Sequence, residues 1–195
     1  MILLIAVVAG TLTGWGYARW NGRTWHPPIF RAVWLVVLGF LPQLAAFYLP
    51  FTRRLLPDDM ASASLVWSQL TLLAFALVNV HLPGMWILAF GLGCNLAVIL
   101  ANGGFMPLPV DTAARLVNPT VLKSLAVGER ISSASKDILL PQSRILLPWL
   151  SDRFVAPSFL PYRFAFSLGD VLVSVGAFWM LIRQPMVPSP VSGDA

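Results

Sequence analysis

Charged residues are scarce in this chain of 195 residues. Only 11% of the residues are Asp, Glu, Lys or Arg, whereas 57% are hydrophobic. A soluble domain is typically about one quarter charged and about half apolar. The shortage of charge is the stronger of the two signals, because a surface in water needs ions and a surface in lipid does not. The composition therefore predicts an integral membrane protein.

Several kinds of functional motif are also absent. The single Cys94 excludes an internal disulfide, and its apolar surroundings predict a small buried residue. The sequence contains no Cys, His and carboxylate cluster with metal spacing, no glycine-rich phosphate loop and no paired catalytic nucleophile. Its Lys and Arg residues are scattered, which argues against a nucleic-acid partner, and the net charge of +5 suits anionic lipid headgroups. The sequence implies neither an enzyme nor a particular cofactor.

Five apolar runs are candidates to cross a bilayer, which takes about 20 helical residues and about 17 at least. They cover residues 2–18, 30–49, 64–80, 84–101 and 164–182. Backbone groups in lipid must bond internally, so each run is predicted to be a helix. We therefore expect an all-α membrane protein, a bundle of five transmembrane helices. A single domain covers residues 1–183, with a long interfacial loop at 102–163, and residues 184–195 form a disordered tail.

An odd number of spans places the two termini on opposite sides of the membrane, which we call side A for the N-terminus and side B for the other. Trp prefers membrane interfaces. With this threading, side B collects Trp15, Trp20, Trp25, Trp34, Trp86 and Trp179. The basic flank of the first span, Arg19 and Arg23, favours a cytoplasmic side B. The expected location is a bacterial inner membrane, with the N-terminus outside and the C-terminus in the cytoplasm.

The 102–163 segment is half apolar and is interrupted by several prolines. Its stretch SRILLPWLSDRF places a short apolar run between Arg144 and Arg153. Apolar segments that are too short to span, with basic rims and a Trp, lie along an interface. We therefore expect this segment to fold over the side A surface; a flexible solvated loop is the alternative.

Polar side chains within the spans are costly in lipid and indicate a functional site. Asp170 is the only acid inside a predicted span, and each of three further spans carries one amide at a similar position: Gln43, Gln69 and Asn95. At 1.5 Å per residue, all four lie roughly 8 to 10 Å from side A. Stripes of small residues share faces with these polar side chains, as Gly84 and Gly91 do with Asn95. We therefore expect the stripes to face one another and the four polar groups to meet inside the bundle.

The stretch ANGGFMPLPV ends the fourth span directly above this polar level. Gly103 or Gly104 can adopt a positive φ and cap the helix. We expect the Asn102–Gly103–Gly104 turn to direct backbone N–H groups toward Asp170, with Arg53 and Arg163 as possible counter-ions. Two interpretations stay open. One is a helix cap over a structural hydrogen-bond cluster, and the other is a small polar binding pocket open to side A.

The two histidines, His26 and His81, lie in predicted loops at side B. They are weak candidates to ligate a metal or a haem from the interface. Interfacial hydrogen bonding is the simpler role, because buried pigment ligands usually lie within a span.

Two short motifs carry a resemblance. NGGFMP at residues 102–107 follows the fourth predicted span, and FSLGD at 166–170 opens the last. Together they resemble an uncharacterised bacterial family of multi-pass integral-membrane proteins, a domain of unknown function. The resemblance covers nearly the whole chain and implies a fold but no activity. It also implies that one feature combines Asn102, Gly103, Gly104, Met106, Pro107, Gly169 and Asp170.

Three functions are compatible with this sequence. The first is a non-catalytic accessory or assembly subunit of a larger membrane complex, whose partners are the lipid bilayer and other membrane subunits. The second is a small transporter or binder of a lipid or solute that uses Asp170 and the Asn102–Gly104 turn. A membrane enzyme acting on lipid headgroups is a third and weaker possibility, because the spans supply no second acid or base near Asp170.

Overall fold

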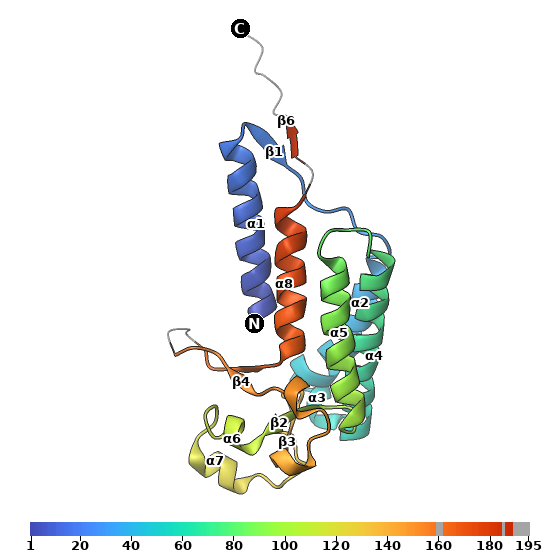
Figure 1. The fold of residues 1–195 in the computed structure, drawn as a ribbon. Coiled ribbons are helices and arrows are strands. Elements are labelled where there is room, and N and C mark those ends of the chain that lie inside the picture. Colours follow the sequence, from blue (N-terminus) through green and yellow to red (C-terminus); the bar gives the residue numbers. More distant parts are fainter. Residues whose placement is uncertain (159–161, 185, 189–195) are drawn as a thin grey trace.

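Five apolar helices form the body of the protein in the computed structural model, which describes residues 1–158, 162–184 and 186–188 (Figure 1). They are α1 (Ile2–Trp20), α2 (Trp34–Gln43) with its π-helical continuation Leu44–Tyr48, α4 (Asp58–Val78), α5 (Met85–Ala101) and α8 (Leu168–Ile182). Each overlaps one predicted span. By length and composition, α1 and α4 can cross a membrane, whereas the other three are shorter. Helix length alone thus supports two crossings and does not support five.

The helices pack side by side in the order α1, α8, α5, α4, α2, so α1 and α2 are the two ends of the row. Glycines allow the closest approach. A Cβ built on Gly91 of α5 would lie 2.7 Å from the Gly169 carbonyl oxygen of α8. Further along the same pair, a Cβ on Gly176 would lie 2.6 Å from the Leu88 backbone nitrogen. The predicted small-residue face of the fourth span therefore does face a neighbouring helix.

One end of the bundle is closed by a short antiparallel pair, β1 (Arg23–Trp25) with β6 (Met186–Pro188). The Trp25 indole donates to the Leu181 carbonyl oxygen at 3.0 Å and ties this pair to α8. Residues 186–188, which fall within the predicted disordered tail, thus pair with β1 through their backbone. Residues 185 and 189–195 of that predicted tail lie outside the described residues.

The opposite end is covered by residues 102–158 and 162–166, which we call the cap (Figure 1). It contains β2 (Met106–Pro109), α6 (Val110–Ala113), α7 (Pro119–Ser124), β3 (Asp137–Leu140), β4 (Phe154–Val155) and β5 (Ala165–Phe166). Strands β2 and β3 pair in parallel, and β4 and β5 pair in antiparallel. A short helix, α3 (Thr52–Leu55), lies between α2 and α4. The all-α prediction is therefore wrong in this part, which the sequence presented only as irregular loop.

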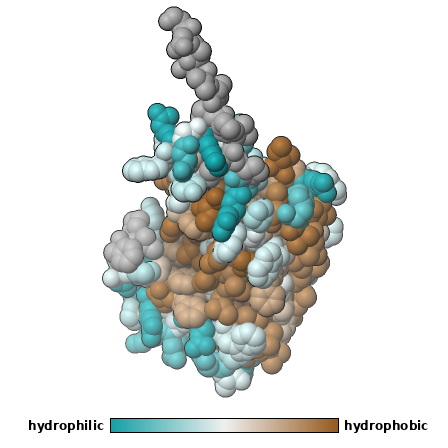
Figure 2. All heavy atoms as spheres, turned by 45° about the horizontal axis from the view of Figure 1, so that its top comes forward, coloured by the Kyte–Doolittle hydropathy of each residue, from teal (hydrophilic) through white to brown (hydrophobic). Residues whose placement is uncertain are grey.

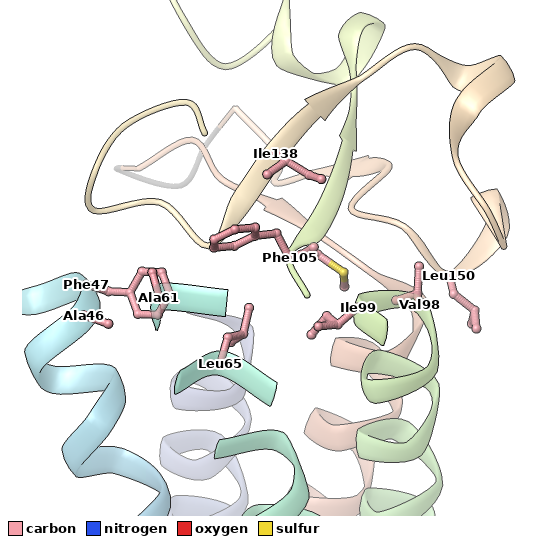
Figure 3. Close-up of a cluster of buried hydrophobic side chains, with 10 residues drawn as sticks. Ala46, Phe47, Ala61, Leu65, Val98, Ile99, Phe105, Ile138 and Leu150 are labelled. Atoms are coloured by element: carbon pink, nitrogen blue, oxygen red, sulfur yellow. The ribbon is translucent and has the colours of Figure 1, made fainter. Parts of the chain in front are cut away.

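The cap packs on the helix ends through a continuous apolar cluster. In Figure 3, Phe105 and Ile138 of the cap face Leu65 of α4 and Ile99 of α5. Arg130 of the cap adds polar contacts, because its guanidinium donates to Asp58 Oδ1 of α4 at 2.9 Å and to the carbonyl oxygens of Ser133 and Ser135. The segment thus packs on the helix ends and is not a solvated loop there.

Large apolar side chains remain exposed along the helices. Examples are Leu4, Leu12, Phe40, Leu77, Phe90 and Leu100. Hydrophobic residues cover the middle of the face drawn in Figure 2, and hydrophilic residues gather toward its upper and lower margins. Apolar surface of this extent is rare on a soluble monomer and marks contact with a membrane or another protein.

Candidate functional site

A pocket of about 380 Å³ lies within the bundle, beneath the cap. Its polar lining comes from every helix of the row except α1, and also from the cap: Gln43, Ser68, Gln69, Asn95, Lys136 and Asp170. The four polar residues predicted to share one level, Gln43, Gln69, Asn95 and Asp170, therefore line the same space. The rest of the lining is mainly apolar and includes Phe40, Leu72, Leu92 and Val173. A pocket of this size is large enough for a small ligand.

Lys136 enters the pocket from the cap. Its ammonium group donates to Gln43 Oε1, and the Gln43 amide in turn donates to Ser68 Oγ. The same ammonium lies 5.8 Å from the ring centroid of Tyr48 and 5.9 Å from that of Phe47. Attraction to the faces of the rings stabilises a cation at this distance. The π-helical turn at the end of α2 supplies both rings, so α2 provides three of the groups that hold Lys136.

Asp170 forms the other polar centre. Its Oδ2 accepts from the Ser167 backbone N–H at 3.0 Å, while Ser167 Oγ accepts from the Asp170 N–H at 3.0 Å. This reciprocal pair is a capping box that starts α8. Asp170 Oδ1 also accepts from the Asn95 amide at 2.9 Å, and Asn95 Oδ1 accepts from Ser167 Oγ at 2.9 Å. The carboxylate is thus fixed in position by α5 and α8 together.

Gln69 differs from the other amides of the pocket. Its Oε1 is buried and has no hydrogen-bond partner within the described part of the chain. A buried acceptor without a donor costs about 1–3 kcal/mol. Gln69 therefore offers the pocket an acceptor that the protein itself does not use.

The Asn102–Gly103–Gly104 turn does not line the pocket. Gly103 and Gly104 adopt φ of +83° and +89°, as predicted, and the Gly104 N–H donates to the Ile99 carbonyl oxygen at 2.8 Å to close the helix. The Asn102 side chain bonds both the N–H and the carbonyl oxygen of Leu146, at 2.9 and 2.8 Å. The donors expected to point toward Asp170 therefore close α5 and hold the cap, and the two motifs are not joined into one site.

The turn acts on the pocket indirectly, because it leads into β2. Met106 N–H donates to the Lys136 carbonyl oxygen at 3.0 Å, and Met106 pairs with Asp137 at the start of β3. This pairing positions Lys136, which sequence reasoning missed. Arg53 and Arg163, the expected counter-ions, do not line the pocket; among the described residues, the basic side chain that does is Lys136. Within the described residues, Lys136 and Asp170 form no ion pair within 4.0 Å.

Two further carboxyl groups lie in the cap near this charge pair: Asp152 is buried and Asp137 is partly buried. Burial raises the pKa of Asp137 to about 6, against the hydrogen bond from Ser135 and the charge of Lys136. Burial also raises the pKa of Asp152 well above its ordinary value, and the charges of Asp137 and Asp170 add to the rise. Desolvation lowers the pKa of Lys136, while the Asp137 and Asp170 carboxylates oppose that change. The charges of the cap and of the pocket therefore influence one another's protonation.

Neither histidine lines the pocket. His26 is exposed, and its Nε2 lies 3.3 Å from Thr24 Oγ1, beside β1. His81 is exposed in the turn between α4 and α5. Among the described residues, no group of three or more His, Cys, Asp or Glu side chains is arranged to hold a metal ion. Neither histidine therefore has the companions that a metal site needs.

Comparison with known proteins places this arrangement in a family. The sequence model of the family of unknown function DUF5317 matches residues 29–182, a stretch that contains the polar pocket residues Gln43, Gln69, Asn95, Lys136 and Asp170. An uncharacterised protein of Thermotoga maritima is 29% identical over 142 residues, which cover 73% of this chain and 75% of that protein. No solved structure matches the chain. The expectation of an uncharacterised family is thus confirmed, and this chain belongs to DUF5317.

Proposed function

We propose that this chain is a multi-pass membrane protein that binds a small lipid or solute in the polar pocket. The single observation that carries the proposal is the lining of the pocket. Polar side chains from four helices and the cap converge on one cavity, although each is costly to bury among apolar helices. A cluster kept only for structure would satisfy its own hydrogen bonds, whereas Gln69 Oε1 remains without a donor among the described residues.

The membrane part of the proposal is a five-span bundle in a bacterial inner membrane, with the N-terminus outside and the C-terminus in the cytoplasm. The exposed apolar side chains of all five helices support it. Exposed Trp residues gather at the β1 end, as expected for an interface: Trp15, Trp20, Trp34, Trp86 and Trp179. The three shorter helices approach the length limit of about 17 residues for a span. A reporter fused after Arg183 is expected to read cytoplasmic, and a periplasmic signal would reverse this orientation.

Two neighbouring valines allow a matched test of the pocket. Val36 lines it, whereas Val37 is 52% exposed on the outer side of the same helix. Val36→Trp is expected to fill the cavity and remove a small molecule that co-purifies with the wild-type protein, detected by mass spectrometry of extracts. Val37→Trp adds the same bulk outside and is expected to retain the molecule. Equal retention by both variants would contradict a binding role for the pocket.

An accessory-subunit function is the second candidate, and an apolar groove of about 490 Å³ favours it. The groove lies on α4 and α5 and includes Leu77, Trp86, Phe90, Gly93 and Ala97. Small residues at every fourth position of α5, such as Ala89, Gly93 and Ala97, suit a partner transmembrane helix. This candidate predicts a fixed protein partner in mild detergent that Gly93→Leu releases. A lone monodisperse protein would count against it.

A further inference from the structure

We propose that the ligand of the polar pocket is a zwitterionic amphiphile of the phosphoethanolamine type, whose phosphate meets Lys136 and whose primary ammonium meets Asp170. This inference rests on the proposed function and names the ligand class. Among the side chains that line the pocket, Lys136 is basic and Asp170 is acidic, so the two carry opposite charges at neutral pH. A ligand with one charge of either sign would meet repulsion from one of them, whereas a ligand with both charges complements the pair.

The space between the two charged groups also favours a zwitterion. Among the described residues, they do not form an ion pair within 4.0 Å, although the Asp170 carboxylate acts electrostatically on Lys136. Separate anchors hold them in place, because Lys136 bonds Gln43 and Asp170 bonds Asn95 and Ser167. A cation and an anion held apart in a low-dielectric setting attract the opposite ends of a dipolar headgroup strongly.

Unused hydrogen-bonding capacity favours a phosphate and a primary ammonium. A lysine ammonium has three donors, and the bond to Gln43 uses one of them. Phosphate oxygens accept such charge-assisted bonds. The unpartnered Gln69 Oε1 needs a donor, which a primary ammonium supplies and a quaternary ammonium lacks. The ethanolamine headgroup therefore fits these groups better than the choline headgroup.

The position of the pocket favours an amphiphile over a free zwitterion. Its apolar lining includes Ile2 and Leu3 of α1, and Val36 and Phe40 of α2. These helices are the two ends of the row and are packed mainly against α8 and α4 rather than against each other. A headgroup can thus lie in the pocket while its hydrocarbon chain lies between α1 and α2, beside exposed Leu3 and Phe40. The volume of about 380 Å³ suits a headgroup and the start of a chain.

The test uses the full chain in dodecyl maltoside and four probes: dodecyl phosphoethanolamine, dodecyl phosphate, dodecylamine and free phosphoethanolamine. Dissociation constants are measured by native mass spectrometry. The zwitterionic amphiphile is expected to bind about tenfold more tightly than each singly charged amphiphile and than the free headgroup. Lys136→Met is expected to shift the preference toward dodecylamine, and Asp170→Asn toward dodecyl phosphate. Opposite shifts separate a charge effect from general destabilisation, which weakens all probes together.

Lys123→Met is the matched control, because Lys123 is an exposed lysine elsewhere in the cap. This substitution is expected to leave the dissociation constants of all four probes unchanged. Dodecyl phosphocholine serves as a further probe with a quaternary ammonium. Gln69→Leu is expected to remove any difference in affinity between dodecyl phosphoethanolamine and this probe. Equal binding of the charged amphiphiles, or parallel losses in both charge variants, would overturn the inference and leave a binding pocket in place. Tighter binding of free phosphoethanolamine would identify a soluble zwitterion and overturn the amphiphile. Failure of every probe, together with equal retention in the two valine variants, would remove the proposed function as well.

Discussion

The Arg130 guanidinium donates to the Asp58 carboxylate at 2.9 Å, but the two partners have very different surroundings. The Arg130 side chain is 6% exposed and the Asp58 side chain is 67% exposed. Arg130 also bonds two carbonyl oxygens of the cap and lies 5.1 Å from the Phe47 ring centroid. The contacts of Arg130 with the cap and α2 therefore matter more than its ion pair with α4.

This difference in exposure predicts that substituting the two partners changes the free energy of unfolding by unequal amounts. Asp58→Asn is expected to cost at most about 1 kcal/mol, because solvent screens an exposed ion pair. Arg130→Met is expected to cost about 2–3 kcal/mol, because it leaves the Ser133 and Ser135 carbonyl oxygens without this donor. Chymotrypsin cleavage of the cap and thermal melting in detergent measure both effects. Equal losses in the two variants would mean that the ion pair itself holds the cap.

Two glycines of α5 test how closely it packs on α8. A Cβ at Gly91 would lie 2.7 Å from both the Gly169 carbonyl oxygen and the Val173 backbone nitrogen, whereas a Cβ at Gly93 would meet no atom of the described residues within 4 Å. Gly91→Ala is expected to destabilise the protein by about 1–3 kcal/mol through overpacking. Gly93→Ala is expected to be neutral or to stabilise the helix by up to about 1 kcal/mol. Thermal melting monitored by tryptophan fluorescence distinguishes them, and similar melting temperatures would contradict the backbone contact.

The turn that closes α5 gives a second glycine pair. Gly103 and Gly104 both have positive φ, so alanine at either position is expected to cost about 1–2 kcal/mol. A Cβ at Gly104 would also lie 2.8 Å from Ser62 Cβ of α4, whereas Gly103 faces open space. Gly104→Ala is therefore expected to be the more harmful, and to weaken ligand binding by displacing β2 and with it Lys136. If Gly103→Ala lowers the melting temperature as much as Gly104→Ala, the contact with Ser62 is unimportant.

The raised pKa of the partly buried Asp137 predicts a pH dependence of stability. Its pKa in the folded protein is about 6, above the ordinary 3.8, so the native state binds the additional proton between these values. The stabilisation is fully present below pH 3.8 and is lost as the pH rises through 6. Asp137→Asn is expected to flatten the melting curve over this window and to be more stable than the wild type at pH 7.5, by at most about 3 kcal/mol.

Asp152 remains in that variant, so the slope decreases and does not vanish. Asp111→Asn replaces an exposed aspartate of the same cap and is the control. An unchanged pH profile for Asp137→Asn would show that Asp137 does not hold the proton.

The sequence predicted the polar level of the pocket because helix geometry is regular. A fixed rise per residue relates Gln43, Gln69 and Asn95 by depth alone, and they do line one pocket. Lys136 could not be predicted in this way, because the pairing of two short strands of the cap, β2 and β3, sets its position. Asn102 was predicted to belong to the pocket, but it bonds Leu146 instead. Its partner is 44 residues away in the sequence, so no local pattern predicts that hydrogen bond. The presence of the helices could thus be predicted from local sequence patterns. The structure of the cap could not, because it depends on tertiary contacts.

The family match begins at residue 29, so the α1 part of the pocket lining, Met1 to Leu3, lies outside it, whereas the polar lining lies within it. For the amphiphile proposed above, substitutions in α1 are expected to alter which hydrocarbon chains bind, by length or by unsaturation, and to leave headgroup recognition intact. Relatives with a different first helix are accordingly expected to select different chains with the same polar chemistry.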